Sequence, residues 1–421
     1  MIKKFSFIFL LAVLLVTACS PATEVTSTAE PIEDAVGTVE EEIPAVSIDG
    51  DWMPCSTIYD YQTTLETNQY QAAVDQQPPV TEDDWIYGNP DAPITVVEYE
   101  DFQCPACPGF SLGIKQLIDT YPSTIRVVFR HLPLASIHDK AYLSSMAAEA
   151  AGAQGKFWEM HDILYYFQST WTGISESEFV EWVKEQAEAL GLDIVQFEKD
   201  LFDQEAREEL EETTEKRLEQ GLHYTPFVVV NDRVWRDNKP NLYGLIGVYE
   251  FGGYEECPPW VIKEGKTYLA RLNTNVGEIE INLFADVAPL AVNSFVFLAQ
   301  KGWFDDVFFH RVIEGFVAQA GDPSGEGMVG PGYTFANETE NNLSYDRAGV
   351  VGMANAGPDT NGSQFFITLA PTTDLDGGYT IFGEVTEASL AVLDKIAFRD
   401  PQTALNFSDA TQILGIEIIE N

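Results

Sequence analysis

Basic residues are scarce in this chain of 421 residues, which has 23 lysines and arginines against 67 aspartates and glutamates. The formal net charge is −44, and no lysine or arginine occurs between Lys4 and Lys115. Nucleic acids and anionic membrane surfaces repel a chain of this charge, so a nucleic-acid-binding function is excluded. The acidity alone does not identify a binding partner, because solubility or adaptation to salt accounts for it equally well.

Long hydrophobic runs are absent after the first 16 residues, so no membrane-spanning helix is predicted there. Phe5–Val16 is an apolar run that follows two lysines and is too short to span a membrane, which is typical of a signal peptide. The run ends in Val-Thr-Ala-Cys19, which resembles the bacterial lipobox. That resemblance implies that residues 1–19 form a lipoprotein signal peptide and that a lipidated Cys19 anchors the protein to a bacterial membrane, outside the cytoplasm. An ordinary signal peptide with an incidental cysteine is the alternative.

Cysteines are also few, and they are Cys19, Cys55, Cys104, Cys107 and Cys257. If Cys19 carries the lipid, four remain, of which Cys104 and Cys107 form a local pair. Thiols outside the cytosol can persist as disulfides. The sequence therefore predicts a structural disulfide between Cys55 and Cys257.

Composition divides the rest of the chain into two domains with connecting segments. Residues 20–50 are acidic and rich in Thr, Ser, Ala and Pro, which predicts a flexible tether. Residues 51–79 contain aromatic side chains and are expected to pack on, or lead to, the domain that follows. Proline pairs mark the boundaries of a first domain (80–257), a linker (258–265) and a second domain (266–421).

The first domain alternates strands with helices. Apolar runs at 94–99, 125–129 and 227–230 predict buried strands, and 139–165 and 175–218 have helical periodicity. Ser175 and Glu178 have the spacing of a capping box at the start of the second helical stretch. This alternation predicts an α/β sheet with a helical insertion.

The second domain consists of short strands and glycine-rich turns. Two strands are expected within 267–284, a helix at 288–300 that begins with Pro289, and further strands at 307–313, 316–320, 364–369, 379–385 and 411–419. Many short strands at modest spacing predict a barrel or a sandwich.

The stretch DFQCPACPGF places Cys104 and Cys107 two residues apart, directly after a predicted strand. If Cys104 caps a helix, Pro105 occupies its first position, and the helix N-terminus favours a Cys104 thiolate, the attacking species in disulfide exchange. A zinc site needs two more ligands, and the sequence has no second CxxC or paired histidine motif. A purely structural local disulfide is the remaining alternative.

VVEYEDFQCPAC, the helical insertion and Tyr-Thr225-Pro226-Phe together resemble the DsbA-like branch of the thioredoxin-fold oxidoreductases over roughly residues 80–250. The resemblance implies that Cys104 is the nucleophile, Cys107 the resolving thiol and Pro226 a cis-proline facing the disulfide. Thr225 would present its backbone to an extended substrate, and Glu98 would be the buried acid that assists proton transfer. An ordinary strand-edge carboxylate is the alternative for Glu98. Two departures leave the redox potential open: Pro105-Ala106 adds no histidine or aromatic ring, and Pro108 is expected near the fourth helical position.

The stretches FHRVIEGFVAQ (309–319) and MANAGPDTNGSQFF (353–366) closely resemble cyclophilins, over about residues 266–420. The resemblance implies a closed antiparallel β-barrel with two helices and peptidyl-prolyl isomerase activity. Arg311 matches the catalytic arginine. The implied substrate-binding residues are Phe316, Phe366 and Leu375 around the proline ring, with Gln319, Ala354, Asn355, Gln364 and Tyr379 beside it. Taken singly, Phe316 and Phe366 would more often be core residues. Asp374 stands where many cyclophilins have tryptophan, so cyclosporin is expected to bind weakly.

These inferences lead to one functional hypothesis, an exported and lipid-anchored folding factor that isomerises X–Pro bonds and exchanges disulfides. Its expected partners are unfolded or folding exported polypeptides and a redox protein that recycles Cys104 and Cys107. No metal or other cofactor is expected. The alternatives are a chaperone-like peptide-binding protein with vestigial activities, or a reductase dedicated to one partner.

Overall fold

The structure is a computed structural model that describes residues 50–58, 65–235, 242–401, 403 and 406–421. Cys19 and most of the predicted tether lie outside these residues. Within the described part of the chain, every helix is too short or too polar to cross a membrane.

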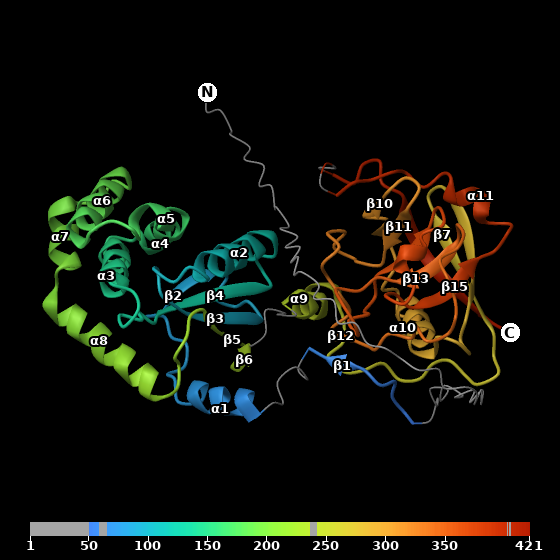
Figure 1. The fold of residues 1–421 in the computed structure, drawn as a ribbon, viewed down its shortest axis with the longest axis horizontal. Helices are drawn as coiled ribbons and strands as arrows, with labels where there is room; N and C mark the ends of the chain where they lie inside the picture. Colours follow the sequence, from blue (N-terminus) through green and yellow to red (C-terminus); the bar gives the residue numbers. More distant parts are fainter. Residues whose placement is uncertain (1–49, 59–64, 236–241, 402, 404–405) are drawn as a thin grey trace, which may run out of the picture. The chain divides into compact units, whose positions relative to one another are not determined.

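The first domain is built on a five-stranded sheet with the strand order β2-β4-β3-β5-β6 (Figure 1). The strands are β2 (Trp85–Gly88), β3 (Ile94–Glu100), β4 (Ile125–His131), β5 (Phe227–Val230) and β6 (Arg233–Trp235). β3 and β4 are parallel, and the other neighbours are antiparallel. The three strands that apolar runs predicted are therefore present, and the half-buried β2 was missed.

The two faces of this sheet follow from the alternation of side chains along β3. Ile94 and Val96 are buried in a cluster with residues of helix α2 (Cys107–Thr120). Val97 and Tyr99 face a different cluster, which includes Ala73 from helix α1 (Leu65–Val74). Glu98 and Glu100 continue the row of Ile94 and Val96, so both carboxyl groups project to the buried face that carries the cysteines.

The helical insertion consists of short helices rather than two long ones (Figure 1). They are α3 (Ala141–Gly152), α4 (Phe157–Tyr166), α5 (Gln168–Trp171), α6 (Glu176–Ala189), α7 (Ile194–Leu201) and α8 (Gln204–Glu219), and α9 (Leu242–Phe251) follows β6. The predicted stretches break at Gly155 and Gly191, both at positive φ, which favours glycine. Asp193 caps the next helix, α7. The capping box of Ser175 and Glu178 is confirmed.

The second domain contains a nine-stranded sheet in the order β10-β11-β14-β13-β15-β8-β7-β16-β9. Its strands are β7 (Tyr268–Thr274), β8 (Gly277–Leu283), β9 (Val307–Phe308), β10 (Arg311–Val312), β11 (Val317–Ala320), β13 (Val350–Met353), β14 (Phe365–Thr368), β15 (Ile381–Val385) and β16 (Gln412–Glu420). Helices α10 (Pro289–Gln300) and α11 (Leu390–Leu393) and the short 3-10 helix η2 (Thr373–Leu375) complete it. Pro289 is the first residue of α10, as expected.

The predicted closed barrel is not formed by hydrogen bonds in the described residues. The sheet curls, but each of its two end strands pairs with one neighbour only: β9 pairs with β16, and β10 pairs with β11. Only Phe309 and His310 separate β9 from β10 in the chain, and these two end strands do not pair with one another. The two end strands of the curled sheet are therefore connected by the backbone of these two residues and not by hydrogen bonds between the strands.

Part of the extension at 51–79 belongs to the second domain. Strand β1 (Ser56–Thr57) pairs with β12 (Tyr333–Thr334), and the Met53 N–H donates to the Pro258 carbonyl at 2.9 Å. By contrast, the Gln71 side chain bonds the backbone of Val234 in the first domain. The extension therefore does not pack on the following domain alone, because its first residues pair with a sheet segment that lies far away in sequence.

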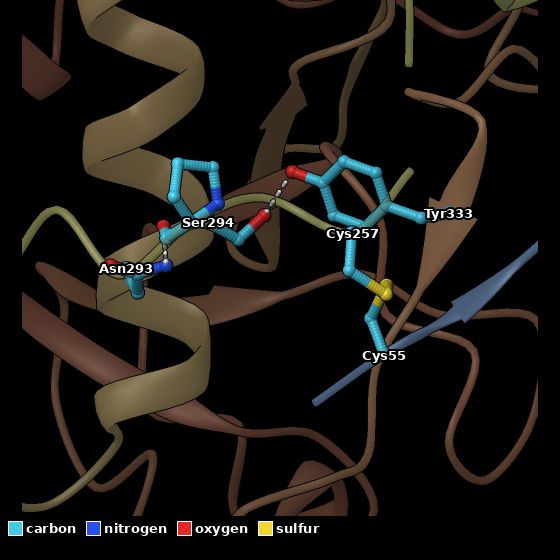
Figure 2. Close-up of a disulfide and its surroundings, with 6 residues drawn as sticks. Cys55, Cys257, Asn293, Ser294 and Tyr333 are labelled. Carbon is cyan, nitrogen blue, oxygen red and sulfur yellow. Dashed lines mark hydrogen bonds between the residues drawn. A yellow bond between two sulfur atoms is a disulfide. The ribbon is translucent and has the colours of Figure 1, made fainter. Parts of the chain in front are cut away.

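Cys55 and Cys257 form a disulfide, as the cysteine count predicted (Figure 2). Beside it, the Asn293 side chain of α10 accepts hydrogen bonds from the N–H groups of Val261 and Ile262 and donates one to the Pro259 carbonyl. The disulfide and Asn293 thus fasten both the extension and the linker to the second domain.

Candidate active sites

Helix α2 begins at Cys107, two residues later than the sequence suggested, and Ala106 is its N-cap. Cys104 therefore precedes the helix, and Pro108 occupies the first turn. Proline fits there because the first helical N–H groups have no intrahelical partner. Pro108 is thus the second helical residue rather than near the fourth, and it removes no intrahelical hydrogen bond.

The Cys104 sulfur lies beside the segment Thr225–Pro226, whose peptide bond is cis. The Cys104 sulfur is 3.3 Å from the Thr225 carbonyl oxygen, to which it donates only in its protonated form. A hydrogen bond from the Cys107 thiol lowers the pKa of Cys104 to about 5, and Thr225 and the N–H groups of Ala106 and Cys107 contribute against the opposing effect of burial. Cys104 is therefore mainly a thiolate at neutral pH, the form that attacks disulfides.

Cys107 has the opposite character. It is fully buried, and burial raises the pKa of its thiol far above the usual range. Both cysteines are free thiols in this structure. The pair thus combines a nucleophile with a thiol that must lose its proton inside the protein before it can react.

The cysteine loop is held in place by the side chains of Asp101, His138 and Gln168, which the sequence analysis did not select. Asp101 accepts hydrogen bonds from the Gln103 and Leu134 N–H groups and from His138. Gln168 of α5 donates to the carbonyls of Phe102 and Cys104. The second contact joins residues 64 positions apart, so no local sequence signal identifies it.

Beneath the cysteines, Glu98 is completely buried, so it is not an ordinary strand-edge carboxylate. Ser111 of α2 donates to Glu98 at 2.9 Å, and the same hydroxyl is 2.9 Å from His161 Nε2 of α4. Burial raises the pKa of Glu98 to about 8, although the bond from Ser111 opposes this. Whether Glu98 assists proton transfer stays a prediction.

Glu98, Glu100 and His161 place one potential metal-ligand atom each within 4.8 Å of one another. However, the Ser111 hydroxyl already bridges Glu98 and His161. We therefore describe these residues as a buried hydrogen-bonded network.

The second site surrounds Arg311 on β10, which pairs with Gln319 on β11. The guanidinium carbon lies 5.5 Å from the centre of the Phe316 ring. Arg130, Arg207, Arg271 and Arg347 form ion pairs, whereas Arg311 forms none within the described residues. The Arg311 side chain is thus left without a carboxylate partner there, and its hydrogen-bond donors are available to a substrate.

Next to Arg311 lies a hydrophobic cluster that contains the residues predicted to hold a proline ring. Phe366 is buried at its centre, and Phe316, Ala354, Leu375 and Tyr379 pack against it. The Tyr379 ring meets the Phe366 ring edge-on at 5.7 Å. These residues come together because β11 and β14 are adjacent. Asp374 is exposed on η2 and is not part of this cluster.

A cavity of about 480 Å³ lies beside the cluster. Its lining includes four of the predicted residues, Gln319, Ala354, Asn355 and Gln364. Gln319 donates to Gln364 at 3.0 Å, which orients both amides. The sequence analysis missed several other lining residues, among them Met328, Pro331, Tyr333, Thr360 and Ser363. The glycine-rich stretch 325–332 was a signal that could have indicated a loop against a ligand.

Comparison with known proteins assigns this second site to a family. The family model for cyclophilin type peptidyl-prolyl cis-trans isomerase matches residues 269–417. Peptidyl-prolyl cis-trans isomerase B of Streptomyces anulatus is 49% identical over 144 residues, which cover 30% of this chain and 82% of that protein. The chain belongs to the cyclophilin-type peptidyl-prolyl cis-trans isomerases. A peptidyl-prolyl cis-trans isomerase of Helicobacter pylori is 45% identical over 146 residues, covering 34% of this chain and 90% of the relative.

The first domain matches a different family model, described as thioredoxin, over residues 80–242. The protein therefore joins a thioredoxin-type domain to a cyclophilin-type domain. Among solved structures, a cyclophilin type peptidyl-prolyl cis-trans isomerase from Cryptosporidium parvum is 35% identical, with a TM-score of 0.34. The match covers 37% of this chain and 99% of that structure.

Proposed function

We propose that the cyclophilin-type domain isomerises X–Pro peptide bonds, with Arg311 as the catalytic cation. The observation that carries this proposal is an arginine without a carboxylate partner beside an apolar cluster of Phe316, Phe366 and Leu375, in a domain whose relatives are named peptidyl-prolyl isomerases. The barrier to peptide rotation is about 20 kcal/mol because the C–N bond has partial double-bond character. A guanidinium that donates a hydrogen bond towards the prolyl nitrogen weakens that conjugation and stabilises the twisted state.

An Arg311→Ala variant tests this assignment. We expect kcat/KM for a proline-containing model peptide to fall about 100-fold or more, because one preorganised donor to a transition state contributes on that scale. Arg347→Ala, which removes an exposed arginine paired with Glu384 on the same sheet, is the matched control. An Arg311→Ala protein that is folded and fully active would contradict the proposal.

We further propose that the thioredoxin-type domain exchanges disulfides through Cys104 and Cys107. The supporting observation is the contrast between the two sulfurs, a stabilised thiolate at Cys104 and a buried thiol at Cys107. The Cys104 thiolate would attack a client disulfide, forming a mixed disulfide and releasing one client sulfur. Cys107, once deprotonated, would attack the Cys104 sulfur, so the client is reduced and the pair oxidised; the reverse sequence oxidises a client dithiol.

Trapping distinguishes this activity from simple peptide binding. Cys107→Ser should accumulate mixed disulfides with a denatured client that carries disulfides, because Cys104 attacks the client disulfide and no resolving thiol follows, whereas Cys104→Ser should form none. If the wild-type protein neither exchanges disulfides nor isomerises proline bonds, it acts as a chaperone-like clamp instead. A reduction potential close to that of a single partner, with no exchange on general clients, would indicate a dedicated reductase.

The location proposed for these activities is outside the cytoplasm, with a lipid on Cys19 anchoring the protein to a bacterial membrane. The support is the N-terminal sequence together with the Cys55–Cys257 disulfide, which suits an oxidising compartment. The substrates would be exported polypeptides, for which proline isomerisation and disulfide formation are slow folding steps. Metabolic labelling with a palmitate analogue, with Cys19→Ser as the control, tests the anchor.

A further inference from the structure

We propose that Glu100 and Glu98 share a proton beneath Cys107, and that Ser111, His161 and Asp162 connect this acid pair to solvent as the path for the proton of the resolving thiol. This inference rests on the proposed disulfide exchange, since it concerns how Cys107 loses and regains its proton. It makes Glu100 a second acid of the site and gives roles to side chains from three different elements.

The acid pair is defined by burial and by missing partners. Glu98 and Glu100 are both fully buried on the same face of β3. Glu98 Oε2 and Glu100 Oε1 have no hydrogen-bond partner among the described residues, and one oxygen of each carboxyl group lies within 4.8 Å of the other. Two carboxylates offer only acceptors, so they satisfy each other only if one of them carries a proton. Two like charges held together in a buried site also cannot both ionise readily.

Glu100 is connected to the cysteines through Tyr165, which donates to it and lies in the same buried cluster as Cys104 and Cys107. The charge of Glu100 also helps to raise the pKa of Cys107, after the larger effect of burial. Burial and the charge of Glu98 raise the pKa of Glu100 well above its usual value, and the Cys104 thiolate adds to this. Tyr165 of α4 donates a hydrogen bond to Glu100 Oε2, which fixes the carboxyl group in place.

From Glu98 a continuous chain of hydrogen bonds leads to the surface. Glu98 Oε1 is 2.9 Å from Ser111 Oγ, which is 2.9 Å from His161 Nε2. On the other side of the ring, His161 Nδ1 is 2.9 Å from Asp162 Oδ1. The Asp162 side chain is 43% exposed, so the chain of contacts ends at solvent.

The protonation states of the groups between Glu98 and Asp162 decide which group donates in each of these hydrogen bonds. Burial lowers the pKa of His161 to about 4, so the ring is neutral at pH 7 and has one N–H. Although burial opposes it, hydrogen bonds from His161 and Lys115 keep the pKa of Asp162 low, so Asp162 is ionised and takes that N–H at Nδ1. Nε2 then accepts from the Ser111 hydroxyl when Glu98 Oε1 carries the proton and donates it to Ser111. When the proton lies instead between the two carboxyl groups, Ser111 donates to Glu98 Oε1.

Transfer along this chain balances the exchange step. As Cys107 attacks the Cys104 sulfur of the mixed disulfide, its S–H bond breaks and the proton passes to the acid pair. The S–S bond between Cys104 and Cys107 forms, and the bond from Cys104 to the client sulfur breaks, so the client leaves as a thiolate with the electron pair. A proton moves from Glu98 through Ser111 and His161 to Asp162 and solvent, while solvent protonates the client thiolate. In the reverse reaction every transfer runs backwards.

Other titratable and charged groups border the path and must be considered in any pH profile. Lys115 of α2 binds both oxygens of Asp162, at 2.7 and 2.6 Å. His131 of β4 bonds Glu149 of α3, and its charge would oppose protonation of His161. The remaining titratable groups beside the path are Tyr165, Cys104 and Cys107.

Infrared difference spectroscopy of the full-length protein tests the shared proton independently of activity. We expect a protonated-carboxyl band at pH 7 that shifts between the dithiol and disulfide forms, and we expect Glu100→Gln and Glu98→Gln each to remove it. Glu338→Gln is the matched control, because Glu338 is a partly buried acid of the cyclophilin-type domain with a pKa raised to about 7. Loss of its band should not change the redox-dependent signal. A redox-sensitive band that survives in Glu100→Gln would overturn the pairing.

Stopped-flow reaction with an aromatic disulfide tests the path, because the two cysteines release the coloured thiol in successive phases. The first phase reports attack by Cys104 and the second reports resolution by Cys107. Ser111→Ala and Asp162→Asn should slow the second phase about 10- to 100-fold at pH 7 and leave the first unchanged, since general acid–base assistance contributes at least this much. Glu159→Gln, which removes an exposed carboxylate that binds Lys156 on the same helix as Asp162, is the control.

Each outcome decides one part of the proposal. Unchanged second phases in Ser111→Ala and Asp162→Asn would overturn the path, as would equal slowing in the Glu159 control. Slowing of both phases would indicate a general structural effect and would also count against it. One equivalent of metal in the purified protein, lost in Glu100→Gln, would show that the cluster binds a cation instead. If the wild type shows no second phase, disulfide exchange itself fails, while the infrared result still decides the acid pair.

Discussion

Removal of the Cys55–Cys257 disulfide should destabilise the cyclophilin-type domain strongly. The bridge spans 202 residues, and the chain-entropy relation for a loop of this length gives about 5 kcal/mol at 25 °C if the whole chain unfolds together. If the thioredoxin-type domain stays folded inside the loop, few residues of the loop gain freedom, and the effect falls towards the roughly 3 kcal/mol of a 15-residue loop. Either value is a large fraction of the 5–15 kcal/mol typical of a domain.

The assay is urea unfolding of a double variant, Cys55→Ala with Cys257→Ala, followed by tryptophan fluorescence and by isomerase activity. With slopes of about 1–3 kcal/mol per molar urea, the midpoint should fall by about 1 M or more. Activity should be lost at lower urea than in the wild type, because β1 and the cavity-lining strand β12 are paired beside the bridge. Cys104→Ala with Cys107→Ala is the control. An unchanged midpoint in the Cys55/Cys257 double variant would refute the reasoning.

Three further predictions concern single groups. The rate of Cys104 alkylation should rise with pH to a midpoint near 5 and stay flat above pH 7, because its pKa is lowered to about 5; a midpoint near 8 would contradict the thiolate assignment. Burial raises the pKa of Glu338 to about 7 from the ordinary 4.5, so the folded state binds the proton more tightly than the unfolded state. The unfolding free energy should therefore fall as the pH rises from about 4.5 to 7, and Glu338→Gln should remove this pH dependence. A wild-type profile without the pH dependence would refute the shift. Ser175→Ala should lower the unfolding free energy by about 1 kcal/mol in urea titrations, because it removes the capping hydrogen bond of α6; no change would mean that the cap is energetically neutral.

Local patterns predicted those features that depend on short sequence distances. Apolar runs located β3, β4 and β5, and the Ser175 spacing identified a helix start. The start of α2 was misplaced because Pro105 and Pro108 both suit a first helical turn, and only the packed structure distinguishes them. Breaks inside the helical insertion were missed because the periodicity continues across Gly155 and Gly191.

Contacts between distant elements could not be read from the sequence. Glu98 was selected through the resemblance to the DsbA-like family, but Glu100 was overlooked beside it. The role of His161 depends on α4 packing over α2, which brings it to Ser111 from 50 residues away. No periodicity encodes such a contact, because tertiary packing decides which buried polar side chains meet.

The Cys55–Cys257 disulfide also constrains the order of folding events as the chain is synthesised. A chain that emerges from its N-terminus exposes Cys55 first, and its partner follows only 202 residues later, after the entire thioredoxin-type domain. Domains generally fold as units in the order in which they emerge. Cys55 is therefore unpaired while the thioredoxin-type domain folds. If Cys104 and Cys107 exchange disulfides as proposed, a thiol of their own chain is among the first that they meet.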